Sequence, residues 1–177
     1  MNHIVSDNLS HELPHLWRFA LRLSRSSSVA EELVQKTAVR ALERRHQFIP
    51  NSTLRSWLYS IMHSIWKNEL RAEAVRQQRT FNTSDIDDIG LEPCAGEGQQ
   101  LFREVIHHVN QLPEAQRTAL LLVCIEGYSY REAADIMDVA IGTVMSHIAR
   151  ARITIGDAFL DLELSPTRDR TEKVSPL

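Results

Sequence analysis

The chain has 177 residues, of which 43% are apolar and 6% aromatic, and its formal net charge is −3. Six Gly and six Pro are too few for a low-complexity or all-β protein, and the length suits one ordinary domain or two small helical ones. Leu, Ala, Arg and Glu, which occur throughout, are strong helix formers. We therefore predict an all-α fold.

The first residues, MNHIVSDNLSHELPHLW, lack a basic leader followed by an apolar core. The longest fully apolar run, Ala119 to Ile125, is far too short to span a membrane. We expect a cytoplasmic protein without stable membrane insertion. Cys94 and Cys124 have no second Cys or His at ligand spacing, so we expect two free thiols rather than a disulfide or a zinc site.

The charge is segregated along the chain. Basic residues outnumber acidic ones before Thr80, whereas the stretch DIDDIGLEPCAGEG, from Asp85 to Gly98, is acidic and has no helical period. Such a stretch is typical of a linker. We predict two small helical domains, at residues 1–79 and 98–162, joined by an acidic flexible linker at 80–97 and followed by a disordered tail at 163–177.

The N-terminal half shows three helical patterns. The first has apolar residues at helical spacing from Leu13 to Leu23, and the second follows a capping-box pattern at Ser28 and Glu31 and continues to about Arg45. The third, from Leu54 to Leu70, is a long amphipathic helix.

The polar side of this third helix carries basic residues beside aromatic ones. Its members are Ser56, Ser60, His63, Ser64, Lys67, Asn68 and Arg71, with Trp57, Tyr59 and Trp66 nearby. Aromatic rings stack on unpaired bases while cations hold phosphates, so this face suits single-stranded nucleic acid. A solvated helix face with core tryptophans explains the same pattern.

In the C-terminal half, one helix should end near Asn110, the next should open at Pro113, and Gly127 should stop it. The following stretch, GYSYREAADIMDVAIGTVMSHIARARITI, has a capping box at Ser129 and Glu132 and a short turn from Asp138 to Ala140. These features predict a helix-turn-helix.

The second helix of this motif has an inward and an outward face. Val144, Ile148, Ala151 and Ile155 recur at steps of four, three and four and should point inward. The outward face would then carry Thr143, Met145, Ser146, His147, Arg150 and Arg152. That face suits a recognition helix in the major groove, although a plain core pair of helices without a DNA role is the alternative.

The order of these motifs resembles the extracytoplasmic-function class of bacterial sigma factors, from about Leu13 to Phe159. AEELVQKT at Ala30 to Thr37 is similar to the family's acidic clamp-binding motif, and LRSWLYSIMHSIWKNELR at Leu54 to Arg71 to its promoter-melting helix. LPEAQR, GYSYREAADIMD and GTVMSHIARAR are similar to its C-terminal domain. The resemblance implies an initiation factor that is not an enzyme and uses no cofactor.

The resemblance also implies partners and sites. The partners would be core RNA polymerase (clamp and flap), promoter DNA in duplex and melted form, and an anti-sigma factor. If the anti-sigma factor is anchored in the membrane, it would hold the protein at the inner membrane. Polymerase would contact Glu31, Glu32, Leu33, Gln35 and Val39. The minus-ten element would contact Phe48, Asn51, Ser52, Arg55, Trp57, His63, Ser64, Lys67, Asn68 and Arg71. The minus-thirty-five element would contact Arg131, Thr143, Met145, Ser146, His147, Arg150 and Arg152.

Three of these positions depart from the family pattern. Ser64, Met145 and His147 replace residues that are common in the family, so we expect fewer or different promoter contacts. Arg117, like Arg131, is a candidate phosphate clamp or else a surface charge.

Two other functions remain open on the sequence. A helix-turn-helix regulator that acts without polymerase would leave the melting-helix resemblance unexplained, and a sigma-like decoy would fit the departures at Ser64 and Met145. An enzyme is disfavoured, because His107 and His108 lie next to each other on a helix and their side chains diverge by about a third of a turn.

Overall fold

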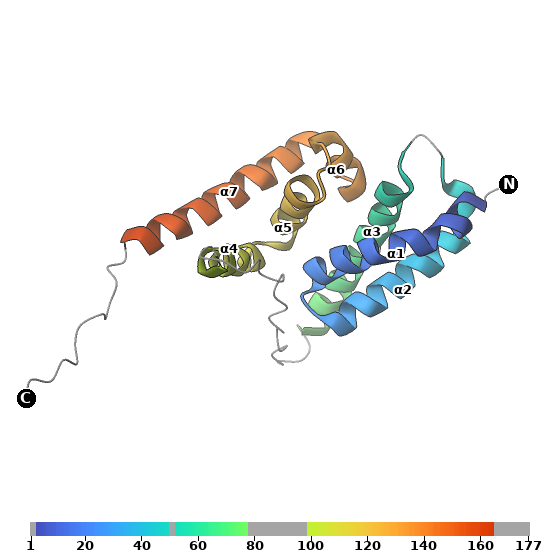
Figure 1. The fold of residues 1–177 in the computed structure, drawn as a ribbon, viewed down its shortest axis with the longest axis horizontal. Coiled ribbons are helices and arrows are strands. Elements are labelled where there is room, and N and C mark those ends of the chain that lie inside the picture. The colour runs from blue at the N-terminus through green and yellow to red at the C-terminus, as the bar shows by residue number, and fades with distance from the viewer. Residues whose placement is uncertain (1–2, 50–51, 78–98, 165–177) are drawn as a thin grey trace, which may run out of the picture.

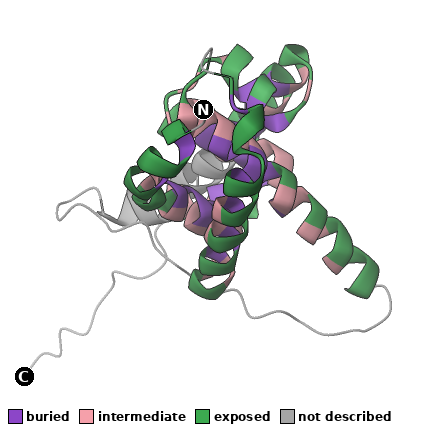
Figure 2. Ribbon diagram, turned by 90° about the vertical axis from the view of Figure 1, so that its right-hand side faces the viewer, coloured by how far each residue is buried: buried purple, intermediate pink, exposed green. Residues whose placement is uncertain are grey.

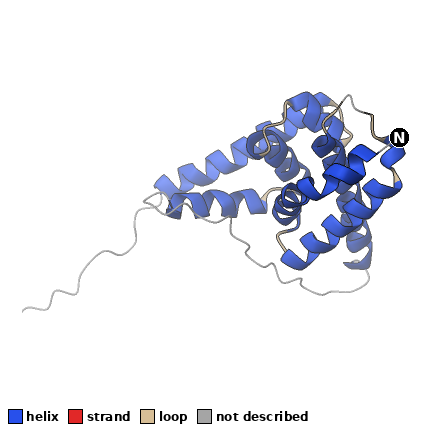
Figure 3. Ribbon diagram, turned by 45° about the vertical axis from the view of Figure 1, so that its right-hand side comes forward, coloured by secondary structure: helices blue, strands red, loops and turns tan. Residues whose placement is uncertain are grey.

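The computed structural model describes residues 3–49, 52–77 and 99–164, and within these ranges it contains helices but no strand (Figure 3). The all-α prediction is therefore confirmed. The helices, in chain order, are α1 (His3–Ser24), α2 (Ser27–Glu43), α3 (Leu54–Gln77), α4 (Gln99–Gln111), α5 (Glu114–Leu120), α6 (Tyr130–Met137) and α7 (Ile141–Leu164). The predicted linker at 80–97 and residues 165–177 of the predicted tail lie outside the described residues, and α7 continues to Leu164.

Helices α1, α2 and α3 pack together as the N-terminal unit, as Figure 1 shows in blue and green. Leu16, Leu33 and Met62, one from each helix, are fully buried. The rings of Phe19 and Tyr59 stack with centroids 4.2 Å apart, which joins α1 to α3. Figure 2 shows the buried residues of the chain in purple. Burial of such apolar faces is the main contribution that holds three amphipathic helices in one bundle.

Helix α1 is longer than its apolar pattern suggested. It begins at His3 and contains Pro14, which removes one helical amide hydrogen. The cap of α2 also differs from the prediction. Arg25, at φ 57°, ends α1, so Ser26 takes the extended N-cap position and its Oγ accepts from the Val29 amide at 3.5 Å, while the predicted cap residue Ser28 lies inside the helix.

Helices α4 to α7 form the C-terminal unit, which contains the helix-turn-helix. The capping box predicted at its start is confirmed: the Glu132 amide donates to Ser129 Oγ at 3.3 Å, and the Ser129 amide donates to Glu132 Oε2 at 2.9 Å. Ala133 and Val144 are fully buried where α6 crosses α7. A small side chain at position 133 permits this close approach.

The turn between α6 and α7 requires a left-handed residue. Asp138 has φ 54° and ψ 52°, and its amide donates back to the carbonyls of Ala134 and Asp135. Aspartate tolerates this conformation better than most residues, although glycine adopts it without strain. The predicted turn from Asp138 to Ala140 is thus confirmed.

Helix α5 ends in a π-helical turn (η2, Leu121–Ile125). The Glu126 amide donates to the Leu121 carbonyl at 2.9 Å, one residue further back than in a regular α-helix. Gly127, at φ 78°, then ends the helix, as its sequence position predicted.

The two units pack against each other. Helix α3 lies against α6, and α1 contacts α5 (Figure 1). The promoter-melting helix of the sequence-based prediction therefore forms part of the surface on which the C-terminal unit rests.

We predict that Asp138→Gly leaves the free energy of unfolding unchanged or slightly raised, and that Asp138→Val lowers it by about 1–2 kcal/mol, because a β-branched residue is strained at positive φ. Chemical denaturation monitored by circular dichroism measures both. Asp135→Val, at an exposed helical position of α6, is the control and should change stability by less than about 0.5 kcal/mol. Equal effects of the two valine substitutions would contradict the role of the left-handed turn.

Candidate nucleic-acid interface

The predicted minus-ten loop leads from α2 into α3. A 3-10 turn (η1, Arg45–Gln47) follows α2, and Phe48 turns inward, with its ring centroid 5.4 Å from that of Trp57. Thr53 Oγ1 accepts from the Ser56 amide at 3.1 Å and caps α3. Phe48 is buried, Ser52 is exposed and Trp57 is half-buried, whereas Asn51 lies outside the described residues. Phe48 is thus a support for Trp57 in this structure.

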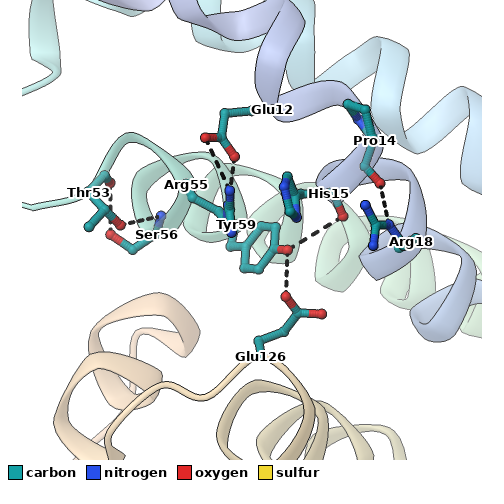
Figure 4. A network of polar contacts seen from close by, with 9 residues as sticks. All are labelled: Glu12, Pro14, His15, Arg18, Thr53, Arg55, Ser56, Tyr59 and Glu126. Atoms are coloured by element: carbon teal, nitrogen blue, oxygen red, sulfur yellow. Dashed lines mark hydrogen bonds and ion pairs between the residues drawn. The ribbon is translucent and has the colours of Figure 1, made fainter.

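Arg55 is held by a carboxylate from α1. Its Nε donates to Glu12 Oε2 at 2.7 Å, and its Nη2 donates to Glu12 Oε1 at 3.5 Å (Figure 4). This two-point contact raises the pKa of Arg55 through its hydrogen bond to Glu12. Paired in this way, the guanidinium fixes the first turn of α3 to α1, so in this arrangement it is not available to a phosphate.

The polar face of α3 divides into an exposed and a covered part. Ser64, Asn68 and Arg71 recur at steps of four and three and are exposed. Lys67 is half-buried, and His63 is only 5% exposed. The prediction that His63 lies on the open DNA face is therefore not met, because the C-terminal unit packs over this side of the helix.

The predicted polymerase-binding face of α2 is mostly exposed. Glu31, Glu32 and Gln35 point to solvent, and Val39 is 57% exposed. Leu33 is fully buried and belongs to the core of the N-terminal unit, which corrects its prediction as a surface contact.

Lys36 stands in the middle of this face and is bound by two carboxylates. Its Nζ lies 2.6 Å from Glu32 on the same helix and 2.6 Å from Glu69 on α3. The hydrogen bonds to Glu32 and Glu69 raise the pKa of Lys36. The lysine thus fastens α2 to α3 just behind the exposed carboxylates.

The recognition helix α7 presents the face that its spacing predicted. Val144, Ile148 and Ala151 are buried and Ile155 is half-buried, so the inward register is confirmed. On the other side, Met145 is 48% exposed, and Arg131, Ser146, Arg150 and Arg152 are also exposed, whereas Thr143 and His147 are half-buried. Ser146 donates its hydroxyl hydrogen to the Gly142 carbonyl at 2.9 Å. Most of the predicted minus-thirty-five residues on α6 and α7 are therefore exposed.

The sequence did not reveal the residues that join the two units. Glu126 Oε1 accepts from Arg22 Nη1 at 2.7 Å. Its Oε2 accepts from the Tyr59 hydroxyl at 2.9 Å, as Figure 4 shows. Glu114 Oε1 accepts from Trp66 Nε1 at 2.9 Å. These pairs are separated by 104, 67 and 48 residues in the chain, and no local pattern relates such distant positions.

The structure also corrects the two roles considered for Arg117. It is 4% exposed, and its Nη2 donates to the Leu23 carbonyl at 2.9 Å, so it is neither a phosphate clamp nor a surface charge. Arg25 Nη1 donates to the Asn110 carbonyl at 2.8 Å beside it. Burial, aided by the nearby Arg25, lowers the pKa of Arg117 to about 10, which leaves it charged at neutral pH.

Two tyrosines at the junction are kept protonated. Burial and the adjacent Glu126 carboxylate raise the pKa of Tyr59 far above its ordinary value of 10.0. Burial raises the pKa of Tyr128, from the C-terminal unit, to about 12. The two rings meet edge to face with centroids 6.0 Å apart. Both hydroxyls therefore stay protonated at any physiological pH.

Comparison with known families agrees with this division into two units. The family model "Sigma-70 region 2" matches residues 9–76, and "Sigma-70, region 4" matches residues 102–155. The two units are therefore those of the Sigma-70 class of transcription initiation factors, in the same order.

Comparison with individual proteins narrows the class. The chain is 35% identical over 149 residues to the ECF RNA polymerase sigma factor EcfG of Rhodopseudomonas palustris, covering 84% of this chain and 81% of that protein. The chain belongs to the family of extracytoplasmic-function (ECF) RNA polymerase sigma factors.

Two solved structures resemble the fold of this protein over most of its chain. The sigma factor RpoE of Bartonella quintana, crystallised with the anti-sigma factor NepR, matches with a TM-score of 0.75 at 28% identity, over 92% of this chain and 99% of that one. The anti-anti-sigma factor PhyR of the same organism, also solved with NepR, matches with a TM-score of 0.57 at 20% identity, over 86% of this chain and 49% of that one, which shows a shared fold alone. Among the described residues, no helix is both long enough and apolar enough to cross a membrane.

We predict that His63 makes stability depend on pH. Burial lowers the pKa of His63 below 6.5, Lys67 on α3 acts in the same direction, and Glu114 on α5 and Asp138 after α6 oppose them. The unfolded chain therefore binds a proton at His63 before the folded chain does, and the free energy of unfolding falls as the pH drops below about 6.5.

Urea denaturation of the parent protein and of His63→Gln at a pH near 7.5 and near 5.5 measures this contribution. The glutamine variant takes up no proton there and should lose less stability between the two conditions. An equal loss in both proteins would contradict the assignment.

Proposed function

We propose that the protein binds core RNA polymerase, directs it to promoters through a minus-thirty-five and a minus-ten element, and starts promoter melting. The observation that carries this proposal is the pairing of Sigma-70 region 2 with region 4 in a single chain, each with an exposed polar face. Its chemistry is recognition alone, since promoter opening takes bases out of the stack without forming or breaking covalent bonds.

Each exposed face has a separate task in this proposal. Glu31, Glu32, Gln35 and Val39 on α2 would bind the polymerase clamp, and region 4 would bind the flap. The face with Ser64, Asn68 and Arg71, together with the Trp57 ring, would capture melted bases of the minus-ten element, because a ring offers a stacking platform and amides offer hydrogen bonds.

The recognition helix would read duplex DNA. Thr143 and Ser146 lie near its N-terminal end and would face base edges, while Arg131, Arg150 and Arg152 supply positive charge for phosphates or guanines. Met145 offers an apolar contact suited to a thymine methyl group. The acidic net charge does not oppose this assignment, because charge is segregated along the chain and basic residues outnumber acidic ones before Thr80.

Regulation by an anti-sigma factor is part of the proposal. The solved relative RpoE was crystallised with its anti-sigma factor, and its chain superposes on both units of this protein. An anti-sigma protein anchored in the inner membrane would hold the factor there until a signal releases it.

A sigma-like decoy is the second candidate, because the fold is shared with the anti-anti-sigma factor PhyR. Runoff transcription separates the two functions. Purified protein is added to core polymerase on a pool of genomic promoter fragments, and the transcript starts are sequenced. We expect starts that depend on the protein and share two upstream motifs at fixed spacing. Polymerase or anti-sigma binding without any dependent start would favour the decoy.

We predict that Arg150→Ala weakens binding to duplex minus-thirty-five DNA. If the side chain reads a base, the loss of binding free energy should be about 1–3 kcal/mol for the cognate sequence. If it holds a phosphate, the loss should be similar for all DNA sequences. Fluorescence anisotropy with the holoenzyme and labelled duplexes measures the change. Arg18→Ala, at an exposed arginine of α1, is the matched control. Unchanged affinity in Arg150→Ala would remove this residue from the interface.

We predict that Asn68→Ala spares duplex binding and reduces promoter opening about tenfold, through loss of hydrogen bonds to an unpaired base. Permanganate footprinting of melted thymines measures opening on the promoter found by runoff. Asn8→Ala, at an exposed asparagine of α1, serves as the control. Full opening by the Asn68 variant would exclude it from the pocket.

A further inference from the structure

The recognition helix α7 carries a row of exposed apolar side chains. Ile141, Met145, Ala149 and Ile153 recur at steps of four along the helix, so they are neighbours on its surface, and all four are exposed. The exposed fraction is 40% for Ile141, 48% for Met145 and 62% for Ile153. Single exposed apolar residues are ordinary, whereas contiguous apolar surface marks an interaction site. We call these four residues the apolar row.

The charges around the apolar row favour duplex DNA as the partner that covers it. From Ile141 to Gly156, α7 contains no acidic residue, and Arg150 and Arg152 are exposed on the same helix. A polyanion therefore meets attraction and no repulsion along this stretch. The adjoining helix positions are those of Ser146 and Arg150, which the proposed function places against the DNA. The apolar row thus borders the side of α7 that would enter the major groove.

The polar side chains at the start of α7 have little capacity left for hydrogen bonds to bases. Ser146 already donates its hydroxyl hydrogen to the Gly142 carbonyl at 2.9 Å. Thr143 and His147 are half-buried, and Arg150, further along, is the first exposed cationic side chain of the helix. The groups that this part of α7 presents most openly are therefore the methyl and methylene groups of the apolar row.

The major groove offers one apolar group to such a surface, which is the C5-methyl group of thymine. Alanine and other small apolar side chains contact this methyl group well. Met145 and Ala149 are one helical turn apart, a rise of about 6 Å, which is close to two base-pair steps of about 3.4 Å each. The two side chains therefore have the spacing to contact two methyl groups in one groove. 5-Methylcytosine carries the same group at the same ring position.

We propose that Met145 and Ala149 recognise C5-methyl groups of pyrimidines in the minus-thirty-five element. This part of the element is then read by apolar contact and not by a pattern of hydrogen bonds. The inference rests on the proposed function and deepens it, because it names the chemical group that is read. It also has a consequence for DNA modification: at these positions 5-methylcytosine is recognised better than cytosine, so methylation of the promoter changes its affinity for the protein.

The test removes single methyl groups from the DNA. Holoenzyme with core polymerase is titrated against fluorescent duplexes that carry the minus-thirty-five motif found by runoff transcription, with one thymine at a time replaced by deoxyuridine. Burial of one methyl group changes an affinity about fourfold, so we expect about fourfold weaker binding at one or two positions. Deoxyuridine outside the motif is the control and should have no effect. Unchanged affinity at every thymine of the motif, or a motif without an A·T pair, would overturn the proposal.

Variants of the apolar row assign each methyl group to a side chain. Met145→Ala should abolish the deoxyuridine effect at one position and Ala149→Gly at the other, whereas Met145→Leu, which stays apolar, should retain it. Ile153→Ala is the matched control, because base contacts come from the start of a recognition helix. At a position that responds, 5-methylcytosine should bind about fourfold more tightly than cytosine. A deoxyuridine effect that persists undiminished in Met145→Ala and Ala149→Gly would come from DNA shape and would overturn the assignment.

The same titrations separate this inference from the proposed function. If the holoenzyme prefers the motif to a scrambled duplex and no methyl group matters, the proposed function stands and methyl recognition is overturned. If the holoenzyme shows no preference for the motif, both fail. If methyl removal has no effect while Met145→Ala and Ile153→Ala both weaken binding to core polymerase, the apolar row is a protein-binding face, which also overturns the inference.

Discussion

A positive charge buried at the junction of the two units constrains the packing around it. Arg117 needs acceptors within reach, and it finds the Leu23 carbonyl near the end of α1, with the Asn110 carbonyl near the end of α4 at 3.4 Å. Helix C-termini carry unpaired carbonyls and partial negative charge, which favour a cation there. Loss of this geometry would leave a charge buried without partners, which is strongly destabilising. The ends of both helices and the start of α5 are therefore fixed relative to one another.

Apolar and polar contacts have different roles in this fold. Leu33, Met62 and Val144 sit in the interiors of the helical units and determine which face of each helix turns inward. Between the units, hydrogen bonds of carboxylates and arginines add directed contacts to an apolar cluster that is continuous across the junction. Polar contacts contribute less net free energy than apolar burial but need precise partners, so they select one arrangement without making it permanent.

The features of the fold that depend on local sequence pattern could be predicted from the sequence. Helical periodicity located the helices, and the capping box at Ser129 and the turn at Asp138 identified the helix-turn-helix. The N-cap of α2 was misplaced by two residues, because the left-handed conformation of Arg25 is not visible in a run of serines. His63 and Phe48 were expected to contact DNA and Leu33 to contact polymerase, and all three are buried. Amphipathic spacing tells which side of a helix is polar, but it does not tell what a second unit covers, nor that Glu126 meets Tyr59.

Because a π-helical turn precedes Glu126, the direction of this side chain depends on the number of residues in the turn as much as on which residues they are. The additional residue in this turn shifts the direction of everything that follows by about 100° around the helix axis. Glu126 faces Arg22 and Tyr59 because its amide bonds to Leu121 and not to Leu122. A single-residue deletion within 121–125 would conserve each bonding partner and still turn the carboxylate away from them. Relatives in which this turn differs in length by one residue should therefore join their two units by other contacts, whatever residue they carry at the position of Glu126.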